Sequence, residues 1–268
     1  PHNYTFVFWA DPRQNNPLSS AQQGPNLVKA ISEHFAESGT KIAFGIAGGD
    51  ITSRGVDYET WKLWYDDIST NGFSTTTPIQ IAIGNHERHD DSGGRNFAKY
   101  YPYEKNAAGF SYSYNYGNVH FTMLDRWNDD EGWYAGDDTV YAQWLEEDLK
   151  NAADAKFKVL SIHPNPLLND GHDGDCTQIM DVARKYNVDL IFCGHWHSYG
   201  TWYLNGTIVN KTSGVNAVPN LCMMIGLGGN TNNKTYAAYC QIDVSPNSLT
   251  IRPRWINGDW FESYLIQK

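Results

Sequence analysis

The chain of 268 residues is 41% hydrophobic and 14% aromatic, a composition that supports a packed core and excludes a disordered protein. Its formal net charge of −10 disfavours nucleic acid as a partner, because affinity for phosphate backbones comes chiefly from lysine and arginine. The sequence contains no run of about 18 apolar residues, which excludes a transmembrane helix. We expect residues 1–268 to form a single domain, since this length is near the upper limit for one core.

The beginning of the chain alternates predicted strands with predicted helices. An apolar run at residues 4–10 predicts a strand that stops at Asp11-Pro12-Arg13. A helix is predicted from residue 25 to residue 39, because proline opens helices and glycine closes them. The next apolar run, at residues 41–47, predicts a strand that leads into Gly48-Gly49-Asp50.

A second helix, predicted at residues 57–70, precedes a third strand. This strand, residues 79–83, ends abruptly at Gly84-Asn85-His86-Glu87, where a glycine is followed by three polar side chains. The repeated order of strand and helix is typical of α/β layering. In open α/β sheets, binding sites form just outside the carboxyl ends of the strands, which is where these polar residues stand.

The middle of the chain opens with a predicted hairpin and then returns to alternating elements. The hairpin pairs residues 110–116 with 118–125. Further helices are predicted at residues 138–151 and 176–186, and strands at residues 157–162 and 188–193. The two strands stop at His163-Pro164 and at Gly194-His195-Trp196-His197, so the same pattern of an apolar run ending on polar side chains recurs. Beyond residue 200 we expect only short strands.

Six side chains at these strand ends are candidate metal ligands. Each of them alone is weak evidence, because a strand-terminal aspartate is usually a cap or turn former and a lone histidine is usually a satisfied polar residue. The inference of a metal site rests on the repeated occurrence of such side chains at the ends of successive predicted strands. Oxygen and nitrogen ligands of this kind suit borderline divalent metals such as zinc, manganese or iron. The six candidates are Asp11, Asp50, Asn85, His163, His195 and His197.

With these motifs in this order, the sequence resembles the calcineurin-like metallophosphoesterases, the superfamily that also contains the purple acid phosphatases. The resemblance spans residues 11–197 and rests on five motifs: Asp11-Pro12-Arg13, Gly49-Asp50, Gly84-Asn85-His86-Glu87, His163, and Gly194-His195-Trp196-His197. It implies an α/β fold of two packed mixed β-sheets flanked by helices, a four-layer α/β/β/α sandwich. The metals would lie at the strand ends.

The resemblance further implies a dinuclear metal-dependent phosphoesterase, either a phosphomonoesterase or a small phosphodiesterase, acting on a small phosphorylated substrate. Asp50 would bridge two metal ions, with Asn85, His163 and His195 on one ion and Asp11 and His197 on the other. Paired ions can polarise a phosphoryl oxygen and turn bound water into an attacking hydroxide. His86 matches the family histidine that assists the leaving group, a role suited to imidazole.

Two positions depart from the family pattern. Arg13 stands where most members carry a histidine ligand, and Ser53 stands where purple acid phosphatases carry a tyrosine. One ion would then have only three protein ligands and could be weakly held. A guanidinium does not bind metal but fits phosphate as a bidentate donor, so Arg13 is a candidate substrate-binding residue. The alternative function is a non-catalytic or single-metal member of the fold that binds a phosphorylated ligand or partner.

The cellular compartment is predicted only from indirect features. The four cysteines, Cys176, Cys193, Cys222 and Cys240, are compatible with two disulfides, although a packed thiol is at least as good a reading of Cys193. The chain begins at Pro1, as it would after removal of a signal peptide. Both features favour a secreted or extracytoplasmic protein. An acidic stretch at residues 169–175 lacks the spacing of a calcium loop and is predicted to be a solvated turn.

Overall fold

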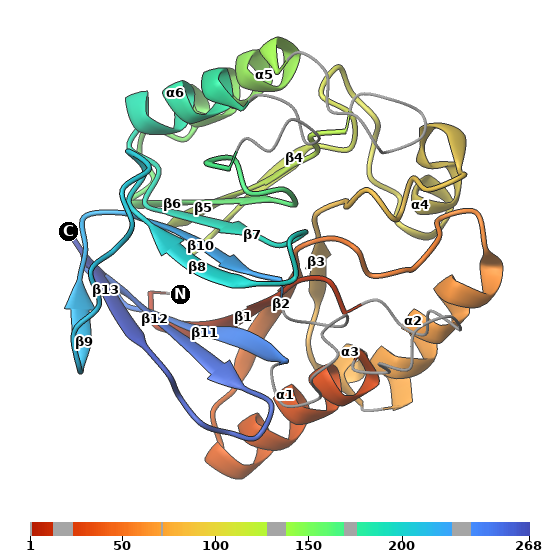
Figure 1. Ribbon diagram of the computed structural model, residues 1–268, viewed down its shortest axis with the longest axis horizontal. Helices are drawn as coiled ribbons and strands as arrows, with labels where there is room; N and C mark the ends of the chain where they lie inside the picture. Colours follow the sequence, from red (N-terminus) through yellow and green to blue (C-terminus); the bar gives the residue numbers. More distant parts are fainter. Residues whose placement is uncertain (1, 13–23, 71, 128–137, 169–175, 227–236) are drawn as a thin grey trace.

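The computed structural model describes residues 2–12, 24–70, 72–127, 138–168, 176–226 and 237–268. Two β-sheets lie face to face in the centre, and helices cover the outer face of each sheet (Figure 1). This arrangement confirms the predicted four-layer α/β/β/α sandwich. Among the described residues, no helix is long and apolar enough to cross a membrane.

The first sheet contains the predicted amino-terminal strands and the last strands of the chain. Its members are β1 (Tyr4–Trp9), β2 (Ile42–Ala47), β3 (Ile79–Ile81), β9 (Val215–Ala217), β11 (Ala238–Val244), β12 (Ser248–Trp255) and β13 (Ser263–Gln267). Within the described residues their spatial order is β3-β2-β1-β11-β12-β13-β9. The strands β1, β2 and β3 are parallel, whereas β11 is antiparallel to β1, so the sheet is mixed.

The second sheet is built from the middle of the chain. Its members are β4 (Tyr112–Tyr116), β5 (Val119–Leu124), β6 (Phe157–Ile162), β7 (Leu190–Cys193), β8 (Tyr199–Trp202) and β10 (Leu221–Ile225). In the described part of the chain their order is β4-β5-β6-β7-β10-β8. The central strands β5, β6, β7 and β10 are parallel, and β4 and β8 are antiparallel edge strands.

The helices form the two outer layers. They are α1 (Gly24–Ser38), α2 (Tyr58–Thr70), α3 (Phe73–Thr76), α4 (Arg95–Tyr100), α5 (Thr139–Asn151) and α6 (Thr177–Lys185), with a 3₁₀ turn at Ser92–Gly94. Figure 1 shows α1, α2 and α3 outside the first sheet, and α5 and α6 outside the second. The four longest helices confirm the predicted ones to within one residue at each end. The short helices α3 and α4 were not predicted, because one or two turns carry too few apolar positions to show a helical period.

Strand β1 explains how the layers are held together. Phe6 and Phe8 point between the two sheets, where Phe8 stacks on Phe192 of the second sheet with ring centroids 4.3 Å apart. Val7 and Trp9 point the other way, into the apolar layer beneath α1 and α2. Successive side chains of a strand face opposite sides, so a strand buried on both faces reads as a continuous apolar run. That is the pattern from which the strand was predicted.

The four cysteines are free thiols in the structure, and all four are buried. The possibility of two disulfides is therefore not supported. Cys193 and Cys222 belong to neighbouring parallel strands of the second sheet and pack in the layer beneath α5 and α6, as expected for small apolar side chains.

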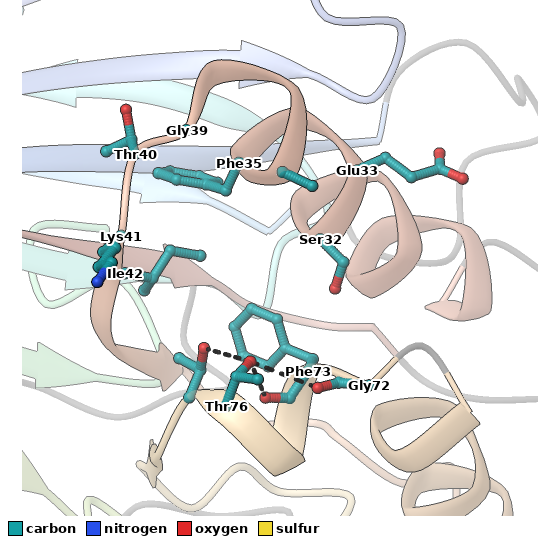
Figure 2. A pocket seen from close by; sticks show the side chains of 12 residues that line it. Ser32, Glu33, Phe35, Gly39, Thr40, Lys41, Ile42, Gly72, Phe73 and Thr76 are labelled. Carbon is teal, nitrogen blue, oxygen red and sulfur yellow. Dashed lines mark hydrogen bonds between the residues drawn. The ribbon is translucent and has the colours of Figure 1, made fainter.

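A cavity between two helices of the first sheet's outer layer lies far from the predicted metal ligands. It has a volume of about 680 Å³ and opens between α1 and α3 (Figure 2). Phe35, Ile42 and Phe73 line it, with threonines and Lys41 at its rim. Ile42 begins β2, whereas the predicted ligand Asp50 follows the end of β2, and a six-residue strand spans about 20 Å. The cavity and the strand-end motifs therefore belong to opposite ends of the sheet.

Helix α5 is anchored to the β4–β5 hairpin by a buried polar network. The Asp148 carboxylate accepts hydrogen bonds from the Thr122 hydroxyl at 2.7 Å and from the Ser113 hydroxyl at 2.5 Å. Its Oδ2 also lies 3.0 Å from Nε2 of His120, which is itself 4% exposed. Burial raises the pKa of Asp148, but these hydrogen bonds lower it by more, so its pKa lies below the ordinary value.

Replacing Asp148 by alanine is expected to lower the free energy of unfolding by about 2–3 kcal/mol at pH 7, because buried donors lose a charged acceptor. A depressed carboxylate pKa contributes stability above the unfolded value, near pH 3.9, and that contribution is lost as the pH falls. The difference from wild type should therefore shrink below about pH 4. Urea unfolding over a pH series measures it, with the exposed Asp154→Ala as control. A difference that does not change with pH would contradict this role.

Candidate metal centre

The polar motifs of five strands meet at one edge of the molecule. Asp11 follows β1, Asp50 follows β2 and Asn85 follows β3, all in the first sheet. His163 directly follows β6, and the His195–His197 segment follows β7 in the second sheet. Because both sheets direct the carboxyl ends of these parallel strands to the same edge, residues up to 186 positions apart in the sequence become neighbours.

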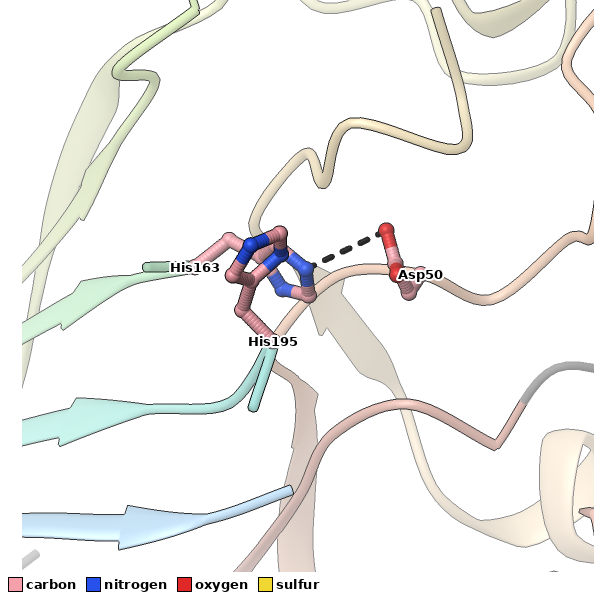
Figure 3. A group of neighbouring side chains, drawn as sticks. All are labelled: Asp50, His163 and His195. Atoms are coloured by element: carbon pink, nitrogen blue, oxygen red, sulfur yellow. Dashed lines mark ion pairs between the residues drawn. The ribbon is translucent and has the colours of Figure 1, made fainter. Parts of the chain in front are cut away.

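One cluster contains Asp50, His163 and His195, whose candidate ligand atoms all lie within 4.8 Å of one another (Figure 3). Nε2 of His163 lies 3.2 Å from Oδ1 of Asp50. The amide oxygen of Asn85 lies 3.1 Å from Nδ1 of His195, which adds a fourth donor to this cluster. A second cluster contains Asp11, Asp50 and His197 within the same limit, with Nε2 of His197 3.4 Å from Oδ1 of Asp11. Asp50 belongs to both clusters.

The buried atoms of these clusters fit bound cations. Asp11, Asp50 and His163 are completely buried. Oδ1 of Asp11 and Nε2 of His163 have no hydrogen-bond partner among the described residues, and they lie 3.8 Å apart. Two buried carboxylates in one site are costly unless positive charge compensates them. The oxygen and nitrogen donors suit zinc, manganese or iron.

The protonation of His163 is fixed on one side of its ring. Nδ1 lies 2.7 Å from the carbonyl oxygen of Gly48, which can only accept, so the proton sits on Nδ1 and Nε2 faces the carboxylates. Burial alone lowers the pKa of His163, but the carboxylates of Asp50 and Asp11 raise it by more, to about 10. This position therefore favours a positive charge, whether from a proton or from a metal ion.

The backbone around the clusters is unusual. Asp11, Asp50, His195 and His197 all have left-handed backbone conformations, with φ values of 55°, 54°, 69° and 47°. Such conformations cost about 1 kcal/mol or more for residues with a Cβ atom, and they persist only where the surrounding structure imposes them. Strain of this kind collects at functional sites.

Two glycines permit the strand ends to approach each other. A Cβ atom at Gly84 would lie 2.3 Å from Oδ1 of Asp50, and one at Gly194 would lie 2.3 Å from Oδ2 of Asp11. Both distances are far shorter than real carbon–oxygen contacts. Each of these glycines immediately precedes a candidate ligand, so the sequence pattern of an apolar run followed by glycine reflects a packing requirement at the site.

The predicted proton donor, His86, lies beside the shared aspartate. Its Nδ1 lies 2.7 Å from the carbonyl oxygen of Ser53, which places the proton on Nδ1. Nε2 lies 3.8 Å from Oδ2 of Asp50, and the side chain is 14% exposed. His86 therefore stands at the edge of the site with one ring nitrogen fixed and the other directed towards the shared carboxylate.

Comparison with known proteins agrees with this geometry. Residues 22–199 match the family model described as calcineurin-like phosphoesterase. The chain belongs to the calcineurin-like phosphoesterase family. It is 29% identical over 156 residues to purple acid phosphatase 23 of Arabidopsis thaliana, covering 53% of this chain and 32% of that protein. An uncharacterized Mycobacterium tuberculosis protein is 25% identical over 183 residues, covering 58% and 34%. This chain thus spans about a third of the length of these relatives.

Solved structures share the fold of this calcineurin-like phosphoesterase at low sequence identity. A purple acid phosphatase from yellow lupin superimposes with a TM-score of 0.75 at 18% identity, covering 99% of this chain and 54% of that one. A dimetal phosphatase from Danio rerio gives 0.74 at 13% identity, covering 98% of both chains. GAP50, the anchor in the inner membrane complex of Plasmodium, gives 0.65 at 13% identity, covering 100% of this chain and 89% of that one.

Two sequence predictions fall outside the described residues. They are Arg13, the candidate substrate-binding residue, and the acidic stretch at residues 169–175. Ser53 is described, and its backbone carbonyl, rather than a side-chain ligand, contacts the site through His86. The six candidate ligands and His86 all lie in the part of the chain that the structure describes.

A supporting cluster behind the metal ligands was only partly foreseen. Asp125, at the end of β5, accepts hydrogen bonds from the backbone of Phe110 and Trp127 and forms a buried ion pair with Arg88. The Trp127 ring is 1% exposed and its centroid lies 5.6 Å from that of His195. The sequence analysis did not assign Asp125 to the site. Its position at the end of a strand next to β6 is the signal that could have drawn attention to it.

Replacing Asn85 by alanine is expected to weaken metal binding on the order of 100-fold while the protein stays folded, because a ligand at a strand end contributes little to the core. His163→Ala should have the same effect. Calorimetric titration of the metal-free protein with Zn²⁺ or Mn²⁺ measures the affinity, and circular dichroism checks the fold. Asn118→Ala, at the opposite end of the second sheet, is the matched control and should bind metal normally. Unchanged affinity in both ligand variants would remove these residues from the site.

Proposed function

We propose that this protein hydrolyses phosphate esters with a pair of divalent metal ions held by its strand-end side chains. The supporting observation is the shared position of Asp50, whose carboxylate belongs to two clusters of donor atoms at once. Membership of the calcineurin-like phosphoesterase family gives the reaction class at the family level. The paired ions and the assignment of individual ligands to them are the finer part of the proposal.

In this proposal Asp50 would be a ligand to both ions. Asn85, His163 and His195 would complete one position, and Asp11 and His197 would complete the other. When bound, paired zinc, manganese or iron ions polarise a phosphoryl oxygen and lower the pKa of water, which generates a nucleophile at neutral pH. The chain contributes the fixed geometry, since its ligands are buried and their backbone is held in a strained conformation.

His86 is the residue we assign to proton transfer. Because the Ser53 carbonyl holds the Nδ1 proton, the ring can gain and lose a proton only at Nε2. That atom lies 3.8 Å from Oδ2 of Asp50, so a phosphate held beside the shared carboxylate would be within its reach. A protonated Nε2 can then donate to the departing ester oxygen.

A panel of small phosphomonoesters and phosphodiesters tests the proposed reaction. The protein is stripped of metal with a chelator, then assayed before and after addition of Zn²⁺, Mn²⁺ or Fe²⁺. Activity should appear only with metal and should be absent in Asp50→Asn, whereas the exposed control Asp154→Asn should behave like wild type. Absence of hydrolysis with every ester and every metal would refute the proposed function.

His86→Ala should slow an alkyl phosphate much more than a nitrophenyl phosphate. An alkoxide needs a proton in order to leave, and general acid catalysis contributes about 10²–10⁴-fold, whereas nitrophenolate leaves unaided. The measurement is kcat/KM for both substrates in the variant and in wild type. Equal slowing of the two would show that His86 only positions other groups.

Arg13 remains a predicted phosphate-binding residue that replaces the family's usual histidine. Arg13→Ala should lose phosphate affinity and rate together, by about 1.5–3 kcal/mol for a charge-assisted contact. Arg13→His restores an imidazole ligand and should raise metal occupancy beside Asp11. Phosphate inhibition and metal stoichiometry measure both effects. If neither quantity changes in either variant, Arg13 lies outside the site.

The alternative is a non-catalytic or single-metal protein of the same fold that binds a phosphorylated ligand or partner. One observation favours it: among the described histidine, cysteine, aspartate and glutamate side chains, this cluster contains three, Asp11, Asp50 and His197, whereas Asn85 adds a fourth donor to the other cluster. A single bound metal together with phosphate binding but no turnover would select this alternative. We also keep a single domain over residues 1–268 and a secreted or extracytoplasmic location as proposals.

A further inference from the structure

Glu87 is a completely buried carboxylate that belongs to neither metal cluster. It follows Asn85 by two positions and is 0% exposed. Among the described residues, no lysine or arginine forms an ion pair with it, so backbone and hydroxyl donors hold its carboxylate. An uncompensated buried carboxylate is costly, and a folded protein retains one only where its contacts are needed.

The contacts of Glu87 join the loops that carry two of the candidate ligands. Oε2 accepts hydrogen bonds from the backbone N–H of Asp50 at 2.8 Å and from that of Gly84 at 2.7 Å. Oε1 accepts from the backbone N–H of Thr52 at 3.0 Å and from its hydroxyl at 3.3 Å. All four partners are donors, and both carboxylate oxygens are used twice.

The hydrogen bonds of Glu87 lie beyond the point at which β2 and β3 stop pairing in the sheet. The register of β2 and β3 ends at Ala47 and Ile81, and one further hydrogen bond runs from Ala82 N–H to the Ala47 carbonyl. Beyond that point the Glu87 carboxylate connects the Asp50 loop to Gly84, the residue before Asn85. The left-handed conformation of Asp50 is held at the same place.

We propose that Glu87 is the positioning residue that sets the distance and orientation of Asp50 relative to Asn85, without touching a metal ion. The inference rests on the proposed function, because it concerns the metals that these two ligands would hold. It deepens that proposal by naming a residue outside both clusters on which metal affinity depends. Residues that orient metal ligands typically change affinity 10–100-fold when altered.

The chemistry of the contacts identifies the informative substitution. Glu87→Gln keeps the size of the side chain but turns one acceptor into an NH₂ group that faces two donors. In either orientation of the amide, donor meets donor, at Asp50 and Gly84 or at Thr52. The loops must then move apart, which displaces the shared carboxylate from its neighbours.

A matched control is available at the opposite end of the second sheet. Asp189 is also a buried carboxylate, 2% exposed, and it accepts a hydrogen bond from the backbone N–H of Lys158 at 2.8 Å. It precedes β7, whereas the candidate ligands follow that strand. Asp189 also pairs with Lys268 at 2.7 Å, so Asp189→Asn removes a buried charge that has its own partners, without altering either metal cluster.

The test is a calorimetric titration of the metal-free wild type, Glu87→Gln and Asp189→Asn with Mn²⁺ and with Zn²⁺, together with thermal unfolding of each metal-free protein. We expect both variants to unfold at a lower temperature, and only Glu87→Gln to bind metal about 10–100-fold more weakly. Wild-type affinity in a folded Glu87→Gln, or an equal loss of affinity in Asp189→Asn, would overturn the inference. Absence of metal binding by wild type would instead refute the proposed function, and this inference with it.

Thr52→Val provides the test if Glu87→Gln does not fold. It removes only the hydroxyl donor to Oε1 and keeps the backbone N–H that binds the same oxygen. A folded Thr52→Val with a smaller but measurable loss of metal affinity would support the positioning role. Unchanged affinity in that variant would count against it.

Discussion

The structure depends on bringing two carboxylates, Asp11 and Asp50, into one completely buried site. Negative charges cannot remain together without water unless cations or donors balance them. The surrounding features serve this requirement: backbone N–H groups bind Oδ2 of Asp11 and Oδ1 of Asp50, and imidazole nitrogens face the remaining oxygen of each carboxylate. The left-handed backbone conformations and the glycines beside the carboxylates have the same cause, because they allow the loops to place carboxylates, N–H groups and imidazoles in one small volume.

The two-sheet fold supplies that volume. Parallel strands from both sheets end at the same edge, so each sheet contributes ligands from loops that follow adjacent strands. The layer between the sheets is packed with interlocking aromatic rings such as Phe8 on Phe192, which fixes the spacing of the two sheets. Packing in the core is therefore coupled directly to the separation of Asp11 and Asp50 from His163 and His195.

Much of this organisation could be predicted from the sequence, because the strands that lead into the site are apolar runs that end near a glycine or a polar side chain. The four long helices and the strand-end residues Asp11, Asp50, Asn85, His163, His195 and His197 were predicted in this way, and the structure brings those residues together. The roles of Glu87 and Asp125 could not be predicted from the sequence, because they depend on hydrogen bonds between loops that are remote in the sequence. The even number of cysteines suggested two disulfides, but all four are free thiols, since neither number nor spacing shows whether two thiols face each other.

The central claim is that one aspartate is shared by two metal positions. Elemental analysis of the purified protein, after equilibrium dialysis against Zn²⁺ or Mn²⁺, measures it most directly. Two ions per chain in wild type, with marked loss of both in Asp50→Asn, is the result that a bridging carboxylate predicts. A wild-type protein that holds one ion or none under these conditions would contradict the paired site.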